Sequence, residues 1–262
     1  GVASAITGTI TFTGTPIADT PSITGASTAE DTQNSAGLVV SRNANDSTEV
    51  THFKITNISG GTLYKNDGTT AISNDAFITF AEANAGLKFT PTANSSSNGT
   101  FDVQGATDNA GAGLSAAATA TVTVSAVGDA PAITGATTNE DVQSASGLVI
   151  TKNGVDGAEV THYKITNIVG GTLYQNDGTT AISDNAFITV NEGSAGLKFT
   201  PTANSTTNGT FNIQAGTDNA GNGLGATTGA TVTVNSVNDA PTATNFNAAE
   251  AYTEDTALTL ID

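Results

Sequence analysis

The 262-residue chain contains no cysteine, methionine or tryptophan, and this narrows the chemistry open to it. Without cysteine there are no disulfides, no thiolate nucleophiles and no zinc sites built on cysteine. The two histidines, His52 and His162, occupy equivalent positions 110 residues apart, so neither has a second histidine close in sequence. We interpret both as strand residues that face outward.

Basic residues are also scarce, since seven Lys and Arg against 24 Asp and Glu give a net charge of −17. Nucleic acids and anionic membrane surfaces bind through Lys and Arg patches, so the sequence predicts neither as a partner. No run approaches the roughly 20 apolar residues of a membrane span, so direct membrane insertion is not expected. The acidic excess favours a surface that attracts cations.

What the sequence does contain is a long internal repeat. Residues 86–95 return unchanged at 196–205, and residues 60–73 return at 170–183 with a single change. The period of 110 residues is close to the size of a single domain, so each unit can bury its own core. The predicted units are the last strand of a preceding repeat (1–18), repeat 1 (19–128), repeat 2 (129–238) and the start of a third, truncated repeat (239–262).

Alternating apolar and polar residues predict an all-β fold in each repeat. Phe53 and Ile55 fall on one face of an expected strand, and 77–80 is expected to be another strand. The Asp67-Gly68 pair predicts a hairpin turn, because it tolerates the positive φ that tight turns require. No stretch shows sustained helical spacing. Short strands separated by turns predict tandem Greek-key antiparallel β-sandwiches of the cadherin or immunoglobulin type, arranged as an extended rod.

The repeats meet at a short acidic motif, Val-Gly-Asp-Ala-Pro at 127–131. It returns at 237–241 with Asn in place of Gly, and more loosely at 17–21. Each copy carries one aspartate shortly before its proline. Because Gly128 stands where the later copy has Asn, the sequence predicts a looser joint here.

Strand direction places further acids beside this motif. A strand of about nine residues after Pro21 spans roughly 30 Å, which puts Glu30 and Asp31 at the C-terminal pole of repeat 1. Alternation through the later strands returns the loops of Asp46 and Asp108 to the N-terminal pole, beside the earlier linker. The carboxylates expected to converge on the central junction are Glu30, Asp31, Asp129, Asp156 and Asp218.

Such a cluster has two interpretations. Carboxylate oxygens on flexible loops suit Ca²⁺, which accepts 6–8 oxygen ligands, and suit the stricter octahedral geometry of Mg²⁺ less well. Alternatively, these are solvated acids that shape turns and caps. Spacing alone leaves both open.

The run Ala-Thr-Asp-Asn-Ala-Gly at 106–111, the alternating Thr and Val strand after it, and the Val-Asn-Asp-Ala-Pro linker together resemble the cadherin-like repeats of large bacterial surface adhesins of the RTX type. The resemblance implies calcium ions that bridge consecutive domains. The positions that match the family's ligand motifs are Glu30 and Glu140, Asp129 and Asp239, Asp46 and Asp156, and Asp108 and Asp218, and the predicted ligand set also includes Asp19, Asp31 and Asp141. The family's Asp-Arg-Glu motif has no counterpart and the early loop keeps one aspartate only, which implies one or two ions per junction.

These observations predict a non-enzymatic, calcium-rigidified extender segment of a large extracellular bacterial adhesin or matrix fibre, acting in cell adhesion or biofilm cohesion at the cell surface. Near-identical tandem repeats argue against a unique active site. The expected partners are neighbouring repeats of the same chain and, in a fibre or matrix, other copies. The alternative is a carbohydrate-binding or self-associating module, in which Tyr64 and Tyr174, together with His52 and His162, would line a sugar-binding face.

Overall fold

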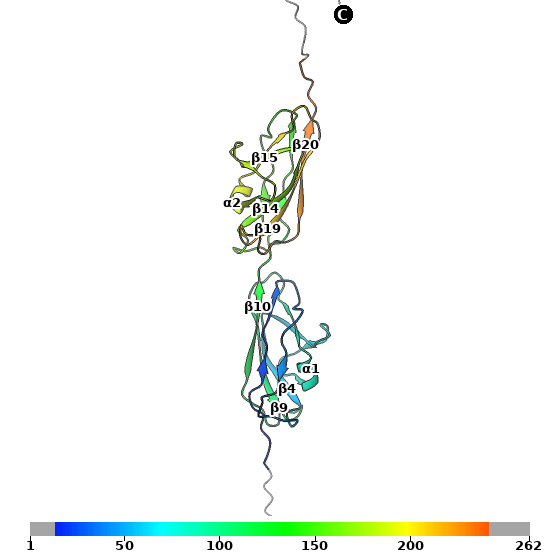
Figure 1. Ribbon diagram of the computed structural model, residues 1–262, viewed down its shortest axis with the longest axis vertical. Helices are drawn as coiled ribbons and strands as arrows, with labels where there is room; N and C mark the ends of the chain where they lie inside the picture. Colours follow the sequence, from blue (N-terminus) through cyan, green and yellow to red (C-terminus); the bar gives the residue numbers. More distant parts are fainter. Residues whose placement is uncertain (1–13, 241–262) are drawn as a thin grey trace, which may run out of the picture.

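The computed structural model describes residues 14–240, which form two β-sandwiches placed one after the other along the chain (Figure 1). Every sheet takes all of its strands from one repeat. The predicted all-β fold of tandem sandwiches is therefore confirmed. Most of the preceding strand predicted within 1–18, and most of the third repeat predicted from 239, lie outside the described residues.

Repeat 1 contains ten strands and one short helix. In chain order they are β1 (Ser22–Ile23), β2 (Ala26–Ala29), β3 (Val40–Ser41), β4 (His52–Ser59), β5 (Gly61–Tyr64), β6 (Ala71–Ile72), β7 (Phe77–Thr79), α1 (Phe80–Asn84), β8 (Lys88–Pro91), β9 (Gly99–Ala106) and β10 (Ala118–Ser125).

Repeat 2 copies this order. Its elements are β11 (Ala132–Ile133), β12 (Ala136–Asn139), β13 (Ile150–Thr151), β14 (His162–Val169), β15 (Gly171–Tyr174), β16 (Ala181–Ile182), β17 (Phe187–Thr189), α2 (Val190–Ser194), β18 (Lys198–Pro201), β19 (Gly209–Gly216) and β20 (Thr228–Asn235).

Each repeat encloses one core between its sheets. The larger sheet has five strands, in the order β2-β10-β9-β4-β7 in repeat 1 and β12-β20-β19-β14-β17 in repeat 2. The smaller sheets are β6-β5-β8 with the pair β1-β3, and β16-β15-β18 with the pair β11-β13. Buried residues from the large and the small sheets of one repeat belong to a single cluster, and the two repeats have separate clusters.

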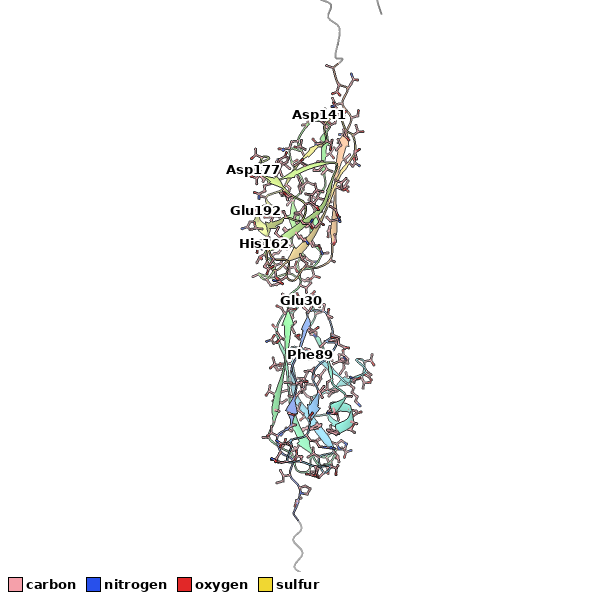
Figure 2. All side chains as sticks on the ribbon, viewed as in Figure 1. Glu30, Phe89, Asp141, His162, Asp177 and Glu192 are labelled. Carbon is pink, nitrogen blue, oxygen red and sulfur yellow. The ribbon has the colours of Figure 1, made fainter. Side chains whose placement is uncertain are left out.

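The alternation predicted along β4 is confirmed, because Phe53 and Ile55 are fully buried while their neighbours are partly exposed. Phe89 (Figure 2), on β8 of the smaller sheet, packs against the glycines of two other strands. A Cβ at Gly61 or Gly99 would lie 2.6 or 2.2 Å from its ring. The core thus places a large ring directly against bare backbone.

The strand predicted after Pro21 is broken, and its second half pairs in a direction that was not predicted. β1 pairs antiparallel with β3, and after the break at Thr24 and Gly25 β2 pairs parallel with β10 in the other sheet. Residue alternation reports which face is buried but not the direction of the partner strand. The broken segment still delivers Glu30 to the C-terminal pole.

Each repeat also has a short helix that the sequence did not predict, and in repeat 1 it takes over the last residue of the strand expected at 77–80. The strand β7 ends at Thr79, and α1 begins at the next residue. The Thr79 hydroxyl accepts the N–H of Glu82 at 3.3 Å, and the Glu82 carboxylate accepts the N–H of Thr79 at 2.8 Å, which forms a capping box. Five residues are too few for helical periodicity to be detected in the sequence. Within residues 14–240, no helix is long and apolar enough to cross a membrane.

Candidate functional site: the junction between the repeats

The linker between the repeats is held from the side of repeat 1 by Glu30, which lies at the end of the lower sandwich that faces the upper one (Figure 2). The backbone N–H of Glu30 donates to Ser125 O at 2.9 Å. Its side-chain Oε1 accepts the N–H of Val127 at 2.5 Å. Glu30 is only 9% exposed, so this carboxylate is part of the packed pole of repeat 1.

Repeat 2 holds the same linker from the other side. Asp156, in the loop between β13 and β14, accepts the N–H of Asp129 on its Oδ1 at 2.9 Å. The N–H of Gly128 donates to Gly223 O at 2.8 Å. Three consecutive linker amides are therefore engaged, the one of Val127 by repeat 1 and the next two by repeat 2. We call the contacts of Glu30 and Asp156 with the linker the carboxylate grips.

The grips recur at the outer poles of the two sandwiches. At the N-terminal pole of repeat 1, the two carboxylate oxygens of Asp46 lie 3.0 and 3.2 Å from the N–H nitrogen of Asp19. At the C-terminal pole of repeat 2, Glu140 Oε1 accepts the N–H of Val237 at 2.7 Å. The contact between Asp46 and Asp19 is the counterpart of the Asp156 grip, one period of 110 residues earlier. The contact between Glu140 and Val237 is the counterpart of the Glu30 grip, one period later.

The junction concentrates negative charge. Burial raises the pKa of the Glu30 carboxyl above its ordinary value, and the charges of Asp31, Glu159 and Asp129 add to this, while the linker amide opposes it. Burial likewise raises the pKa of Asp156, supported by the charges of Asp129 and Glu159. Both gripping carboxylates are thus less easily ionised than free ones.

Glu159 is a junction residue that the sequence reasoning missed. Its charge acts on Glu30 in repeat 1 and on Asp156 in its own repeat. The available signal was its counterpart one period earlier, Glu49, which directly follows the loop predicted to contain Asp46.

Three of the five carboxylates predicted to converge do contact or form the linker: Glu30, Asp129 and Asp156. Asp31 does not, because its Oδ1 accepts the N–H of Asn94 at 2.8 Å.

At the far pole of repeat 2, Asp141 (Figure 2) repeats the contact of Asp31 by accepting the N–H of Asn204 at 2.8 Å. Asp239 is exposed. Neither shares a hydrogen bond with the grip of Glu140 on the following linker.

Asp218, the fifth predicted carboxylate, shapes its own loop. Its Oδ1 accepts the N–H groups of Ala220 and Asn222 at 2.9 and 3.0 Å. The Asn222 side chain and these amides hold the pKa of Asp218 below its ordinary value. Asp108 binds two amides of its own loop in the same way. This corresponds to the alternative interpretation of loop-shaping acids.

A calcium site requires several oxygen ligands that converge on one point. Among residues 14–240, no group of three or more His, Cys, Asp or Glu side chains is placed to hold a metal ion. Glu30 Oε1 and Asp156 Oδ1 accept linker N–H groups, so one oxygen of each carboxylate is already used by the linker. As arranged, these carboxylates fit the linker amides better than a shared ion. Calcium bridging stays a prediction.

The looser joint predicted from Gly128 stays a prediction, while the structure shows what this glycine contacts. It is buried, and a Cβ added to it would lie 2.7 Å from the backbone and Cβ of Ala215 on β19. In repeat 1 the same contact joins Ala18 to Gly105, with the methyl group on the linker instead. Each contact thus pairs one alanine with one glycine. The alanine lies on the linker in repeat 1 and on β19 in repeat 2. Gly128 therefore allows close docking of the linker onto repeat 2.

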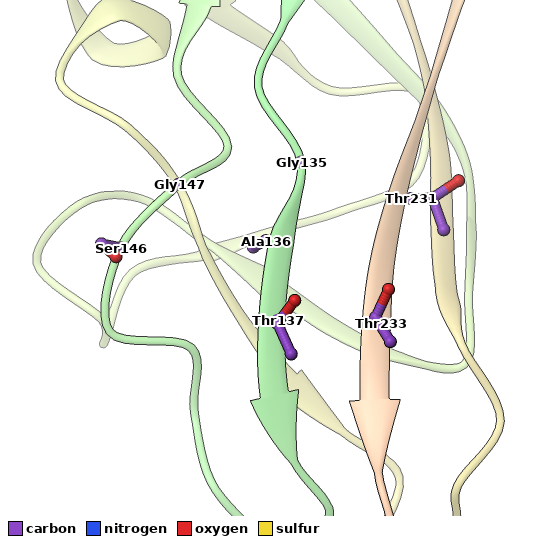
Figure 3. A pocket seen from close by; sticks show the side chains of 7 residues that line it. All are labelled: Gly135, Ala136, Thr137, Ser146, Gly147, Thr231 and Thr233. Carbon is purple, nitrogen blue, oxygen red and sulfur yellow. The ribbon is translucent and has the colours of Figure 1, made fainter.

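A groove of about 440 Å³ lies on repeat 2 beside β12 and β20 (Figure 3). Its lining consists of Gly135, Ala136, Thr137, Ser146, Gly147, Thr231 and Thr233. These residues supply methyl and hydroxyl groups but neither an aromatic ring nor a charge. Tyr64 and Tyr174, the residues predicted for a sugar-binding face, are not part of it.

No family model and no curated protein matches the chain. Among solved structures, it is similar to a conjugate transposon protein from Bacteroides vulgatus, with 18% identity over 45% of this chain and 92% of that one and a TM-score of 0.29. It is also similar to the FN1–FN3 domains of chicken CNTN1 (11% identity, 84% of this chain and 69% of that one, TM-score 0.28). A third is Drosophila N-cadherin EC1-3 (12% identity, 86% of this chain and 66% of that one, TM-score 0.26). The fold assignment rests on the sheets described above.

Proposed function

We propose that this chain is a spacer, a stiff and non-enzymatic extender segment of a large extracellular bacterial adhesin or matrix fibre. The observation that supports it is the pair of carboxylate grips, in which Glu30 of one sandwich and Asp156 of the next bind linker amides two residues apart. A linker bound by both neighbours restricts the angles that the two domains can adopt. Such a segment would hold a distal binding domain away from the cell.

Neighbouring repeats of the same chain are the proposed partners. The grips on Asp19 and Val237 support this, because they hold linkers at the outer poles in the way that the central linker is held. In a fibre or matrix, other copies of the chain would be further partners.

Calcium is the proposed counter-ion of the junction. Glu30, Asp129, Asp156 and Glu159 gather negative charge there, and a divalent cation would neutralise it. An ion that binds only the straight arrangement stabilises that arrangement in proportion to its occupancy. Sites in extracellular modules fill at millimolar calcium.

Small-angle scattering of the full chain, recorded with calcium and with chelator, separates the parts of this proposal. An extended particle in calcium that becomes flexible in chelator supports calcium as the stiffening ion. Equal extension in both conditions removes calcium from the proposal and leaves the amide grips as its basis. A flexible chain in both conditions would overturn the spacer function.

A further inference from the structure

Two buried side-chain atoms in the described part of the chain have no hydrogen-bond partner in the protein: Asp156 Oδ2 and Tyr163 Oη. Tyr163 is fully buried. Burial, and after it the charge of Asp156, raises the pKa of Tyr163 to about 12, so the hydroxyl keeps its proton and remains a donor. The carboxylate oxygen is an acceptor. Because an unpaired buried polar group is costly, each of these atoms calls for a partner, the hydroxyl as donor and the carboxylate oxygen as acceptor.

Repeat 1 shows the same loop without the hydroxyl. Phe53 stands at the position of Tyr163, and both oxygens of Asp46 lie within hydrogen-bond distance of the Asp19 N–H, at 3.0 and 3.2 Å. In repeat 2 only Oδ1 of Asp156 binds the linker amide. The second carboxylate oxygen is therefore released from the linker only in the repeat that carries the tyrosine.

The core of repeat 2 has made room for this tyrosine. Gly193 of α2 replaces Ala83, and a Cβ at Gly193 would lie 2.8 Å from Cδ2 and Cε2 of the Tyr163 ring. Nearby, Val190 replaces the larger Phe80. Glycine is a poor helix former, so the exchange costs α2 helix propensity while it leaves the Tyr163 ring against bare backbone. Gly193 thus lies against the ring that carries the buried hydroxyl.

We propose that one internal water molecule bridges Tyr163 Oη and Asp156 Oδ2. The hydroxyl donates to the water, and the water donates to the carboxylate, which satisfies both atoms. Buried waters are found where several polar groups otherwise lack partners. The bridge makes Tyr163 a positioning residue, which keeps Asp156 turned so that Oδ1 faces the linker amide. This site goes beyond the spacer function and holds whether or not the chain is a spacer.

A crystal structure of the full chain, grown in chelator at a resolution that shows ordered waters, tests the site directly. The expected result is one density peak within about 2.5–3.0 Å of both oxygens. A direct hydrogen bond between the two side chains would overturn the proposal. So would a space without density between them, or a peak that forms only when calcium is supplied, because the ligand would then be a cation.

A mutant cycle in the full chain tests the coupling. Tyr163→Phe restores the residue found in repeat 1, so the variant is expected to fold. It should lower the urea midpoint of repeat 2 in the native background and change it much less when combined with Asp156→Ala. Equal decreases in both backgrounds would overturn the bridge.

Phe53→Tyr is the matched control in repeat 1. It adds a hydroxyl where Asp46 already has both oxygens at the linker amide and where Ala83 is retained. The expected result is a lower urea midpoint for repeat 1. A midpoint that stays the same or rises would show that a hydroxyl needs no partner at this position, which also counts against the bridge.

Discussion

At the scale of single residues, a position that differs between the two repeats can still keep the same side-chain hydrogen bond. Lys65 and Gln175 are the only difference within a 14-residue match. Lys65 Nζ lies 2.7 Å from the Glu82 carboxylate, and the Gln175 amide lies 3.0 Å from that of Glu192. The substitution removes a charge but keeps the hydrogen bond, so the contact itself is what the fold requires.

Gly193→Ala is expected to destabilise repeat 2 by about 1–3 kcal/mol, because the new methyl group would overlap the Tyr163 ring in a filled core. Circular dichroism recorded during urea unfolding measures this loss of stability. Ala83→Gly in repeat 1 is the matched control and should cost about 1 kcal/mol through lost helix propensity. A Gly193→Ala variant more stable than the native chain would contradict the close packing seen here.

Asp67 gives a prediction about acid stability. Its carboxylate accepts the Thr70 hydroxyl and the N–H groups of Thr69 and Thr70, and these bonds lower its pKa from 3.8 to about 2. A lowered native pKa contributes stability that is present above pH 3.8 and is lost as the pH falls through about 2. Asp67→Asn should therefore lower the urea midpoint of repeat 1 near neutral pH and flatten its decline in acid.

The same substitution in repeat 2 provides an independent measurement. Asp177, whose pKa is also lowered to about 2, binds Thr179 and Thr180 in the same way. Asp177→Asn should change the acid dependence of repeat 2 and leave that of repeat 1 unchanged. If both variants decline with pH as the native chain does, the turn carboxylates do not contribute to its acid sensitivity.

At the scale of elements, α1 depends on its capping box more than on helix propensity. A five-residue helix cannot sustain itself through backbone hydrogen bonds alone, because nucleation is costly. Thr79 and Glu82 satisfy each other's backbone N–H groups at its start. The helix is therefore set by a pair of side chains three residues apart.

Thr79→Ala should lower the stability of repeat 1 by about 0.5–2 kcal/mol, because the cap is lost. Thr79→Ser retains the hydroxyl and should cost much less. Thermal unfolding of both variants makes the comparison. Equal losses for Ala and Ser would assign the effect to packing of the threonine methyl group instead of the cap.

At the scale of the whole molecule, the carboxylate grips predict how stiffness depends on Glu30. Glu30→Ala removes the acceptor for the N–H of Val127 and should broaden the distribution of angles between the repeats. Glu30→Gln keeps a carbonyl acceptor without the charge and should retain the native distribution in chelator. Residual dipolar couplings or small-angle scattering of the full chain measure this distribution of angles.

Glu140→Ala is the control for this series, because it removes the equivalent grip on Val237 and leaves the central linker intact. Its central junction should stay as stiff as in the native chain. If Glu30→Ala behaves like Glu140→Ala, the grip on Val127 does not determine the junction geometry.

Much of this architecture could be predicted from residue patterns. Alternation predicted the buried face of β4, and strand counting placed Glu30 at one pole and Asp46 beside the linker at the other. The pattern did not predict α1, because five residues hold little periodicity. Nor did it predict the parallel pairing of β2, because alternation carries no information on strand direction.

The sequence by itself determined the repeat, the all-β class and the position of the acids at the boundaries, because these follow from period, alternation and strand length. Only the tertiary structure decided what the acids bind. Glu30 and Asp156 reach linker amides, whereas Asp31 and Asp218 turn to nearby loops. A carboxylate accepts any donor within reach, and the reach of each side chain depends on how the poles pack.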